Sequence, residues 1–223
     1  MKKILALVMA MTMGMGLVAC GSSTSADTAA ADTTTETTES TDAAADTTAA
    51  DGDASYLIGI CQLVQHPALD AATQGFKDAL TEEFGDAVQF DEQNAQGDSN
   101  TCSTIINSFV SEGTDLILAN ATAALQAAQA GTSDIPVLGT SVTEYGVALG
   151  IDDFNGTVGN NISGTSDLAP LDQQADMLHE LFPDAKNVGI LYCSAEANSS
   201  YQSNTIQKYL KDYGYECTEY TFA

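Results

Sequence analysis

From Tyr56 onward, short apolar segments alternate with longer amphipathic ones, and this alternation restricts the folds that the chain can adopt. Four segments have the length and apolar content of strands: residues 56–62, 88–91, 115–119 and 135–139. Helical patterns lie between them, beginning at Pro67, at the capping residue Ser99 and at Thr122. Strands separated by helices form parallel sheets through right-handed crossovers, so the expected fold class is α/β.

A stretch rich in glycine and asparagine, residues 146–163, interrupts the pattern, and we interpret it as a crossing segment. The alternation then restarts, with helices expected over 171–182 and 198–213 and strands over 187–193 and 216–221. The strand–helix–strand order repeats, which predicts two similar lobes: 56–162, including the crossing segment, and 163–223. Because only two strands follow the crossing, we expect the second lobe to be incomplete, in a fragment or a truncated gene product.

The first 55 residues predict export and anchoring. Residues 1–20 have a basic start and an apolar run of signal-peptide length, and they end in LVAC, which resembles the lipobox of bacterial lipoproteins. Lipidation is therefore expected at Cys20, with a membrane anchor on the extracytoplasmic face of the cell. Residues 21–55 contain only Gly, Ser, Thr, Ala, Asp and Glu, so they predict a disordered tether.

Charge and cysteine content exclude several classes of function. The net charge is −25, with six lysines and no arginine, so a nucleic-acid partner is not expected. Cys61, Cys102, Cys193 and Cys217 have neither CxxC nor zinc-site spacing, and we expect neither a metal nor a cofactor. The four are interpreted as small buried residues, although export would also permit a disulfide.

Ligands of open α/β sheets bind beyond the carboxyl ends of the strands, where this sequence places five polar loops. Their helix N-termini offer free N–H groups to a carboxylate, Asp167 and Glu196 suit an ammonium group, and Tyr145 suits stacking on a ligand. Taken singly, Thr122 or Ser166 could equally be a helix cap. The candidate ligand-binding residues are Gln62, Leu63, His66, Asn120, Ala121, Thr122, Ser141, Thr143, Tyr145, Ser166, Asp167, Ser194, Glu196, Asn198 and Ser199.

Catalytic motifs do not occur in the sequence. There is no GxSxG, no HExxH and no GxxxxGK[ST], and the loop residue His66 has no recognisable nucleophile or orienting partner. We therefore expect a protein that is not an enzyme and in which His66 lines the pocket.

Seven short motifs follow one another in this order: IGICQLVQHPALD (58–70), QNAQGD (93–98), DLILA (115–119), DIPV (134–137), GTSDLAP (164–170), FPDAK (182–186) and VGILY (188–192). Together they resemble the TrpX-like family of ABC substrate-binding proteins over residues 56 to about 221. The resemblance implies a two-lobed periplasmic-binding-protein fold with parallel sheets flanked by helices. Glu144-Tyr145, where the family usually has Asp-Pro, and Gln65, where it often has Glu, depart from the pattern near the expected cleft.

The resemblance also implies delivery of a small solute to a membrane permease. Our first hypothesis is the lipid-anchored binding protein of an ABC importer, with permease and ATPase subunits as partners and an amino-acid-like ligand, an aromatic amino acid among the options. An extracellular sensor that passes closure to a receptor is the alternative, and a secreted enzyme is the third hypothesis.

Overall fold

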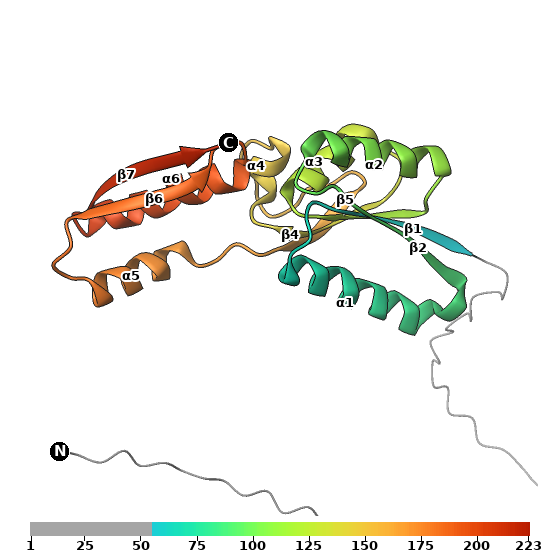
Figure 1. Ribbon diagram of the computed structural model, residues 1–223, viewed down its shortest axis with the longest axis horizontal. Helices are drawn as coiled ribbons and strands as arrows, with labels where there is room; N and C mark the ends of the chain where they lie inside the picture. Colours follow the sequence, from blue (N-terminus) through green and yellow to red (C-terminus); the bar gives the residue numbers. More distant parts are fainter. Residues whose placement is uncertain (1–54) are drawn as a thin grey trace, which may run out of the picture. The chain divides into compact units, whose positions relative to one another are not determined.

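The computed structural model describes residues 55–223, which contain one five-stranded sheet and one two-stranded sheet (Figure 1). The larger sheet is parallel throughout and has the order β2-β1-β3-β4-β5. Its strands are β1 (Tyr56–Gln62), β2 (Val88–Asn94), β3 (Leu116–Asn120), β4 (Val137–Val142) and β5 (Ile162–Ser166). Its helices are α1 (Pro67–Phe84), α2 (Ser99–Glu112), α3 (Thr122–Gly131) and α4 (Tyr145–Leu149), and a short 3-10 turn (Gly85–Ala87) precedes β2.

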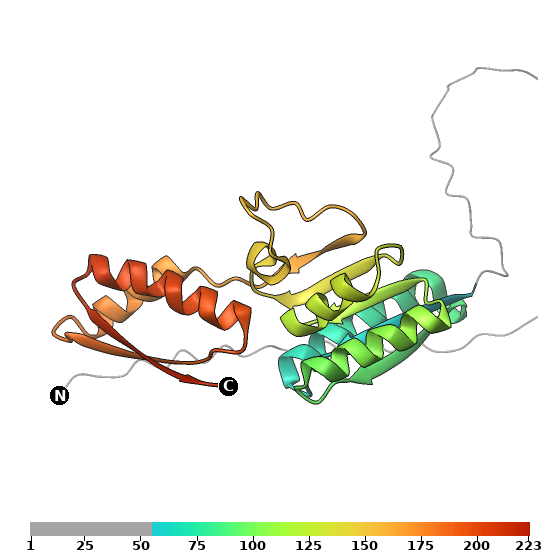
Figure 2. The same cartoon turned by 90° about the horizontal axis from the view of Figure 1, so that it is seen from above.

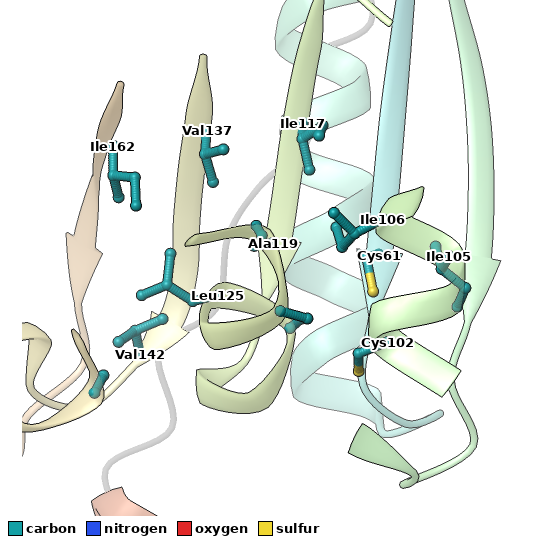
Figure 3. Packing of buried hydrophobic residues seen from close by; sticks show 14 of the residues in the cluster. Cys61, Cys102, Ile105, Ile106, Ile117, Ala119, Leu125, Val137, Val142 and Ile162 are labelled. Carbon is teal, nitrogen blue, oxygen red and sulfur yellow. The ribbon is translucent and has the colours of Figure 1, made fainter. Parts of the chain in front are cut away.

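Alternating side chains of the strands fill two cores, one on each face of this sheet. Ile58 and Ile60 of β1 point to the face that α1 covers. Cys61 points to the opposite face and joins the larger cluster under α2 and α3 (Figure 3). Gly59 lies on that face as well, because a Cβ there would stand 2.6 Å from the ring of Phe109. The expected α/β sheet flanked by helices is thus confirmed, with α1 on one side and α2 and α3 on the other (Figure 1).

The smaller sheet repeats the opening unit of the larger one. Strands β6 (Asn187–Cys193) and β7 (Glu216–Phe222) pair in parallel over seven residues, as β1 and β2 do. Helix α6 (Ala197–Asp212) connects them and packs with α5 (Leu171–Leu181) around a small core (Figure 2). The core consists of Ala175, Leu210 and Tyr215.

Two elements overlap the ends of the segment 146–163, which the sequence placed outside regular structure. Helix α4 starts at Tyr145, and β5 occupies residues 162–166 as the edge of the larger sheet, where the sequence placed the start of the second lobe. Only the first residue of β5, Ile162, is buried, so the strand has none of the apolar alternation that marks the others. A boundary drawn at residue 163 therefore falls inside a strand that belongs to the first sheet.

The expected signal peptide with Cys20, and the tether apart from Ser55, lie outside the described residues. Within residues 55–223, no helix has both the length and the apolar character needed to cross a membrane.

Candidate ligand-binding site

A cleft of about 450 Å³ opens where the carboxyl ends of β1, β3 and β4 meet. Its walls come from the loops after these strands, from Asp167 after β5 and from the start of α6. The lining residues are Leu63, Val64, His66, Leu69, Ser99, Ala121, Thr122, Ala123, Gln126, Ser141, Thr143, Asp167, Ala195, Glu196, Ala197 and Asn198. The position is the one that parallel α/β sheets use for ligands, because the strand-to-helix turns there leave helix N-termini facing a crevice.

Nine of the candidate residues line this cleft: Leu63, His66, Ala121, Thr122, Ser141, Thr143, Asp167, Glu196 and Asn198. The structure therefore brings together residues from all five loops that the sequence singled out. The other six candidates do not line it, and the physical reasons differ among them.

Gln62 and Asn120 lie beneath the cleft in a buried polar network. The Gln62 amide donates to Asp70 at 2.6 Å, and its oxygen accepts from the Thr73 hydroxyl at 2.7 Å. The Asn120 amide donates to Thr73 at 2.9 Å and to the carbonyl of Leu69 at 2.9 Å. Because these bonds tie the ends of β1 and β3 to α1, the two side chains support the cleft floor rather than face a ligand.

Tyr145 does not line this cleft either, and it lines instead the larger cavity along β5. Its ring is 5% exposed and packs against Gly139 of β4, while its hydroxyl donates to the carbonyl of Thr165 at 3.1 Å. Burial, followed by the negative charge of Asp167, raises the pKa of Tyr145 to about 12. The ring belongs to the packing between β4 and β5, which the sequence did not reveal because β5 itself was missed.

The three serines outside the cleft satisfy local hydrogen bonds. Ser166 donates to the carbonyl of Thr143 at 2.7 Å, Ser194 to that of Phe222 at 3.2 Å, and Ser199 to the carboxylate of Glu196 at 2.9 Å. Their hydroxyls hold loops together, which is the capping and turn role that such residues often have.

The helix N-termini around the cleft differ in whether a side chain caps them. His66 caps α1 by accepting from the N–H of Ala68 at 3.2 Å, and Asp98 caps α2 by accepting from Thr101 at 2.6 Å. Asp98, and not Ser99 as expected, is the N-cap, and the hydrogen bond from Thr101 lowers the pKa of its carboxyl. In contrast, no side-chain hydrogen bond caps α3 or α6 in the described structure. Two helix N-termini with unsatisfied N–H groups therefore meet at the cleft.

The α3 terminus is bordered by hydroxyls and by unusual backbone. Thr122 and Thr143 line the cleft although each is only 7% exposed, and their hydroxyls make no side-chain hydrogen bond within residues 55–223. Ala121 has φ 94° and ψ 161°, and Ser141 has φ 54°. Such conformations are rare without glycine and concentrate at ligand sites, where they aim backbone groups.

Negative charge in the cleft comes from two residues on different walls. Asp167 follows β5, and its carboxylate has no hydrogen-bond partner among residues 55–223, whereas the Glu196 carboxylate accepts from Ser199. No lysine is among the lining residues. In the described part of the chain no group of three His, Cys, Asp or Glu side chains is placed to hold a metal. The cleft therefore presents N–H and hydroxyl donors that can bind an anion and a carboxylate that can bind a cation.

Sequence reasoning missed Val64, Leu69, Ser99, Ala123, Gln126, Ala195 and Ala197 as lining residues. Val64, Ala195 and Ala197 lie inside loops that were identified, so treating whole loops as lining would have found them. Leu69 is the third residue of α1 and Gln126 the fifth of α3, and helical periodicity alone does not reveal which residues near the start of a helix face a neighbouring loop.

A larger cavity, of about 730 Å³, lies along β5 and the 154–159 segment. Its one carboxylate, Glu144, is already occupied, because it accepts from the N–H groups of Gly146 at 2.9 Å and Val147 at 2.6 Å. The smaller cleft combines unsatisfied donors with an unoccupied carboxylate, and it is therefore the better candidate for binding a polar solute.

Parallel sheets with a polar cleft at their carboxyl ends place the chain among periplasmic-binding-protein-like α/β proteins, and solved structures agree. One is an ABC domain from Streptococcus pneumonia in complex with L-Trp, with a TM-score of 0.70 and 32% identity over 76% of this chain and 58% of that one. Another is the ligand-free, open form of a substrate binding protein with adhesive properties from Clostridium difficile, with a TM-score of 0.58 and 38% identity over 75% and 58%.

The model of the ABC transporter substrate binding protein family matches residues 57–222. The chain therefore belongs to this family. A tyrosine-binding protein from Clostridioides difficile is 41% identical over 165 residues, which are 73% of this chain and 48% of that protein. The chain thus spans about half the length of this curated relative.

Proposed function

We propose that this protein is the extracytoplasmic, lipid-anchored solute-binding component of an ABC importer and that it binds an amino acid in the cleft. Family membership supports the transport role. The observation that carries the ligand class is the pair of uncapped helix N-termini, α3 and α6, which open into the same cleft.

The carboxylate of the ligand is assigned to the N-terminus of α3. Hydrogen bonding within this helix begins at Leu125, whose N–H donates to Ala121 at 3.1 Å, so the N–H groups of Thr122 and Ala123 remain available. The hydroxyls of Thr122 and Thr143 add two donors in the same nearly dry position. Backbone N–H groups and the helix dipole bind an anion without any arginine or lysine.

The ammonium group is assigned to Asp167, and the side chain to the apolar wall. Leu63, Val64 and Leu69 provide that wall. An aromatic side chain fits this composition, and the tyrosine-binding relative and the L-Trp complex support the same class of ligand. Glu196 and Asn198 line the cleft from the start of α6, so a bound ligand contacts both lobes, and binding favours the form in which the lobes enclose it.

Isothermal titration calorimetry on the full chain tests the ligand assignment. We expect L-tyrosine or L-tryptophan to bind, and we expect the matched amine without the carboxylate and the matched acid without the ammonium group each to bind about 10–100-fold more weakly. Thermal shift extends the test to sugars; ligand at about 100 times its Kd adds about 2.7 kcal/mol to the free energy of unfolding. Stabilisation by sugars alone would contradict the proposal.

A pair of aspartate variants tests the ammonium site. Asp167→Asn should weaken amino-acid binding about 10-fold and leave binding of the acid without the ammonium group unchanged. Asp172→Asn, an exposed residue of the first turn of α5, is the matched control and should change neither. Equal losses for both ligands in Asp167→Asn would show that the carboxylate does not contact the ammonium group.

The anchor and the transport role need separate experiments. Cys20→Ala should release the protein from the membrane fraction, and unchanged retention would remove the lipoprotein assignment. Delivery to a permease predicts ligand uptake into vesicles that contain the permease and ATPase subunits only when this protein is added. No turnover of the bound amino acid is expected, because the cleft pairs no nucleophile with a base.

A further inference from the structure

Two cysteines lie side by side in the core next to the cleft. Cys61 is the penultimate residue of β1, and Cys102 lies in the first turn of α2. Both are fully buried in the same cluster, beneath the helix that covers this face of the sheet (Figure 3). Their thiols share a hydrogen bond, which raises the pKa of Cys61 and lowers that of Cys102.

The remaining described cysteines cannot form a rival pair with each other. Cys217 is opposite Val188 in the β6–β7 register, while Cys193 lies five residues further along β6. At about 3.3 Å per residue the two are about 17 Å apart along the sheet, far beyond the reach of a disulfide.

We propose that Cys61 and Cys102 form an intramolecular disulfide when the chain folds outside the cytoplasm. The proposal rests on the export that the proposed function includes. The oxidant is a disulfide of the thiol–disulfide exchange class, either a small molecule or a protein. The Cys102 thiolate attacks one sulfur of the oxidant and releases a thiol. The Cys61 thiolate then attacks the mixed disulfide, releases the second thiol and closes the bond. Two protein thiols are oxidised, and one external disulfide is reduced to two thiols.

The position of the pair gives the bond two consequences. Cys61 lies two residues before Leu63 and Cys102 three residues after Ser99, so the bridge fixes two elements that line the cleft. It also closes a loop of about 40 residues that contains all of α1 and β2, and this restricts the unfolded chain. Because both thiols are inaccessible in the folded protein, the bond forms before α2 covers β1 and is then protected from reductants.

Refolding the full chain in a glutathione redox buffer tests the bond independently of ligand binding and of cellular location. Free thiols are then blocked with N-ethylmaleimide in denaturant, and the digested peptides are mapped by mass spectrometry. All four described cysteines are free thiols in this structure. After oxidative refolding we expect one linked peptide pair that contains Cys61 and Cys102, together with alkylated Cys193 and Cys217. Alkylation of both Cys61 and Cys102, or a link to any other cysteine, overturns the proposal. Either result leaves the calorimetric test of the ligand unaffected.

Melting temperatures provide the second measurement. The oxidised protein should melt about 10 °C above the protein refolded with reductant. The double variant Cys61→Ala, Cys102→Ala should lose this dependence on reductant, and the control Cys193→Ala, Cys217→Ala should keep it. A wild-type melting temperature that is the same with and without reductant, or a control that loses the difference, counts against the bond. If the first double variant does not fold, peptide mapping of the wild type decides.

Discussion

Replacement of Tyr145 by phenylalanine tests whether this side chain is buried between strands or exposed in the cleft. The change removes only the hydroxyl, which donates to the Thr165 carbonyl, and the lost hydrogen bond should lower the free energy of unfolding by about 1 kcal/mol at pH 8. The tyrosine has a pKa of about 12 in the folded protein and 10.0 when solvated. The folded state therefore holds the proton more tightly, and its stability is complete below pH 10 and falls as the pH rises toward 12.

The size of this loss follows from the two pKa values. At pH 11 the wild type should have lost about 1.4 kcal/mol through Tyr145, while the phenylalanine variant has no proton to lose. The initial deficit of the variant, about 1 kcal/mol, should therefore vanish between pH 10 and pH 11. Urea unfolding followed by circular dichroism at pH 8, 9, 10 and 11 measures the free energy of unfolding of both proteins. The contributions of all other titrating groups cancel in the difference between the two free energies. Tyr220→Phe, at a ring that is 58% exposed, is the control and should match the wild type at pH 8. A deficit of Tyr145→Phe that stays constant up to pH 11 would refute the buried position.

Three further substitutions test local features of the fold. Ala121→Gly should raise the free energy of unfolding by about 1 kcal/mol in urea titrations, since glycine tolerates φ 94°; a loss of stability would show that the backbone is not strained. Asp98→Ala should lower the melting temperature by roughly 2–4 °C through loss of the α2 cap. The hydrogen bond from Thr101 lowers the pKa of Asp98. The melting-temperature difference between the wild type and Asp98→Ala should therefore be complete above about pH 4 and shrink in acid. A melting-temperature difference that persists in acid would contradict the capping role of the Asp98 carboxylate. Gly164→Ala should cost about 3 kcal/mol in the same titrations, because a Cβ would overlap the Gly139 carbonyl on β4, and a neutral result would mean that β4 and β5 are paired differently.

Six of the seven strands could be predicted, and for β1 the burial of the strand leaves a mark on the sequence. β1 is buried on both faces, and its residues form a continuous apolar run that only a central strand tolerates. β5 leaves no such mark, since it is an edge strand with one buried residue among glycine, serine and threonine. Its place in the sheet is set by pairing with β4, a long-range interaction that no local pattern encodes.

The loops of the cleft could be predicted from topology, whereas the direction of individual side chains could not. Parallel strands bring their carboxyl ends to one edge, and that rule alone collects His66, Thr122 and Asp167. At the very end of a strand, however, a polar residue can face either the cleft or the core. Gln62 and Asn120 face the core because Thr73 of α1 offers them partners there, and this choice depends on packing between elements.

Helix capping explains why one terminus rather than another should receive the ligand. A side chain that caps a helix satisfies the same N–H groups that an anion would bind, so His66 and Asp98 remove α1 and α2 as anion sites. Ala121 has no side-chain oxygen with which to cap α3, and its strained backbone directs the uncapped turn into the cleft. The proposed site predicts that a bound carboxylate supplies the stabilisation that a capping side chain would otherwise contribute to α3. In the proposed site, the ligand carboxylate therefore binds at the one terminus of the first lobe that the described residues leave uncapped, and the uncapped start of α6 lies at the same cleft.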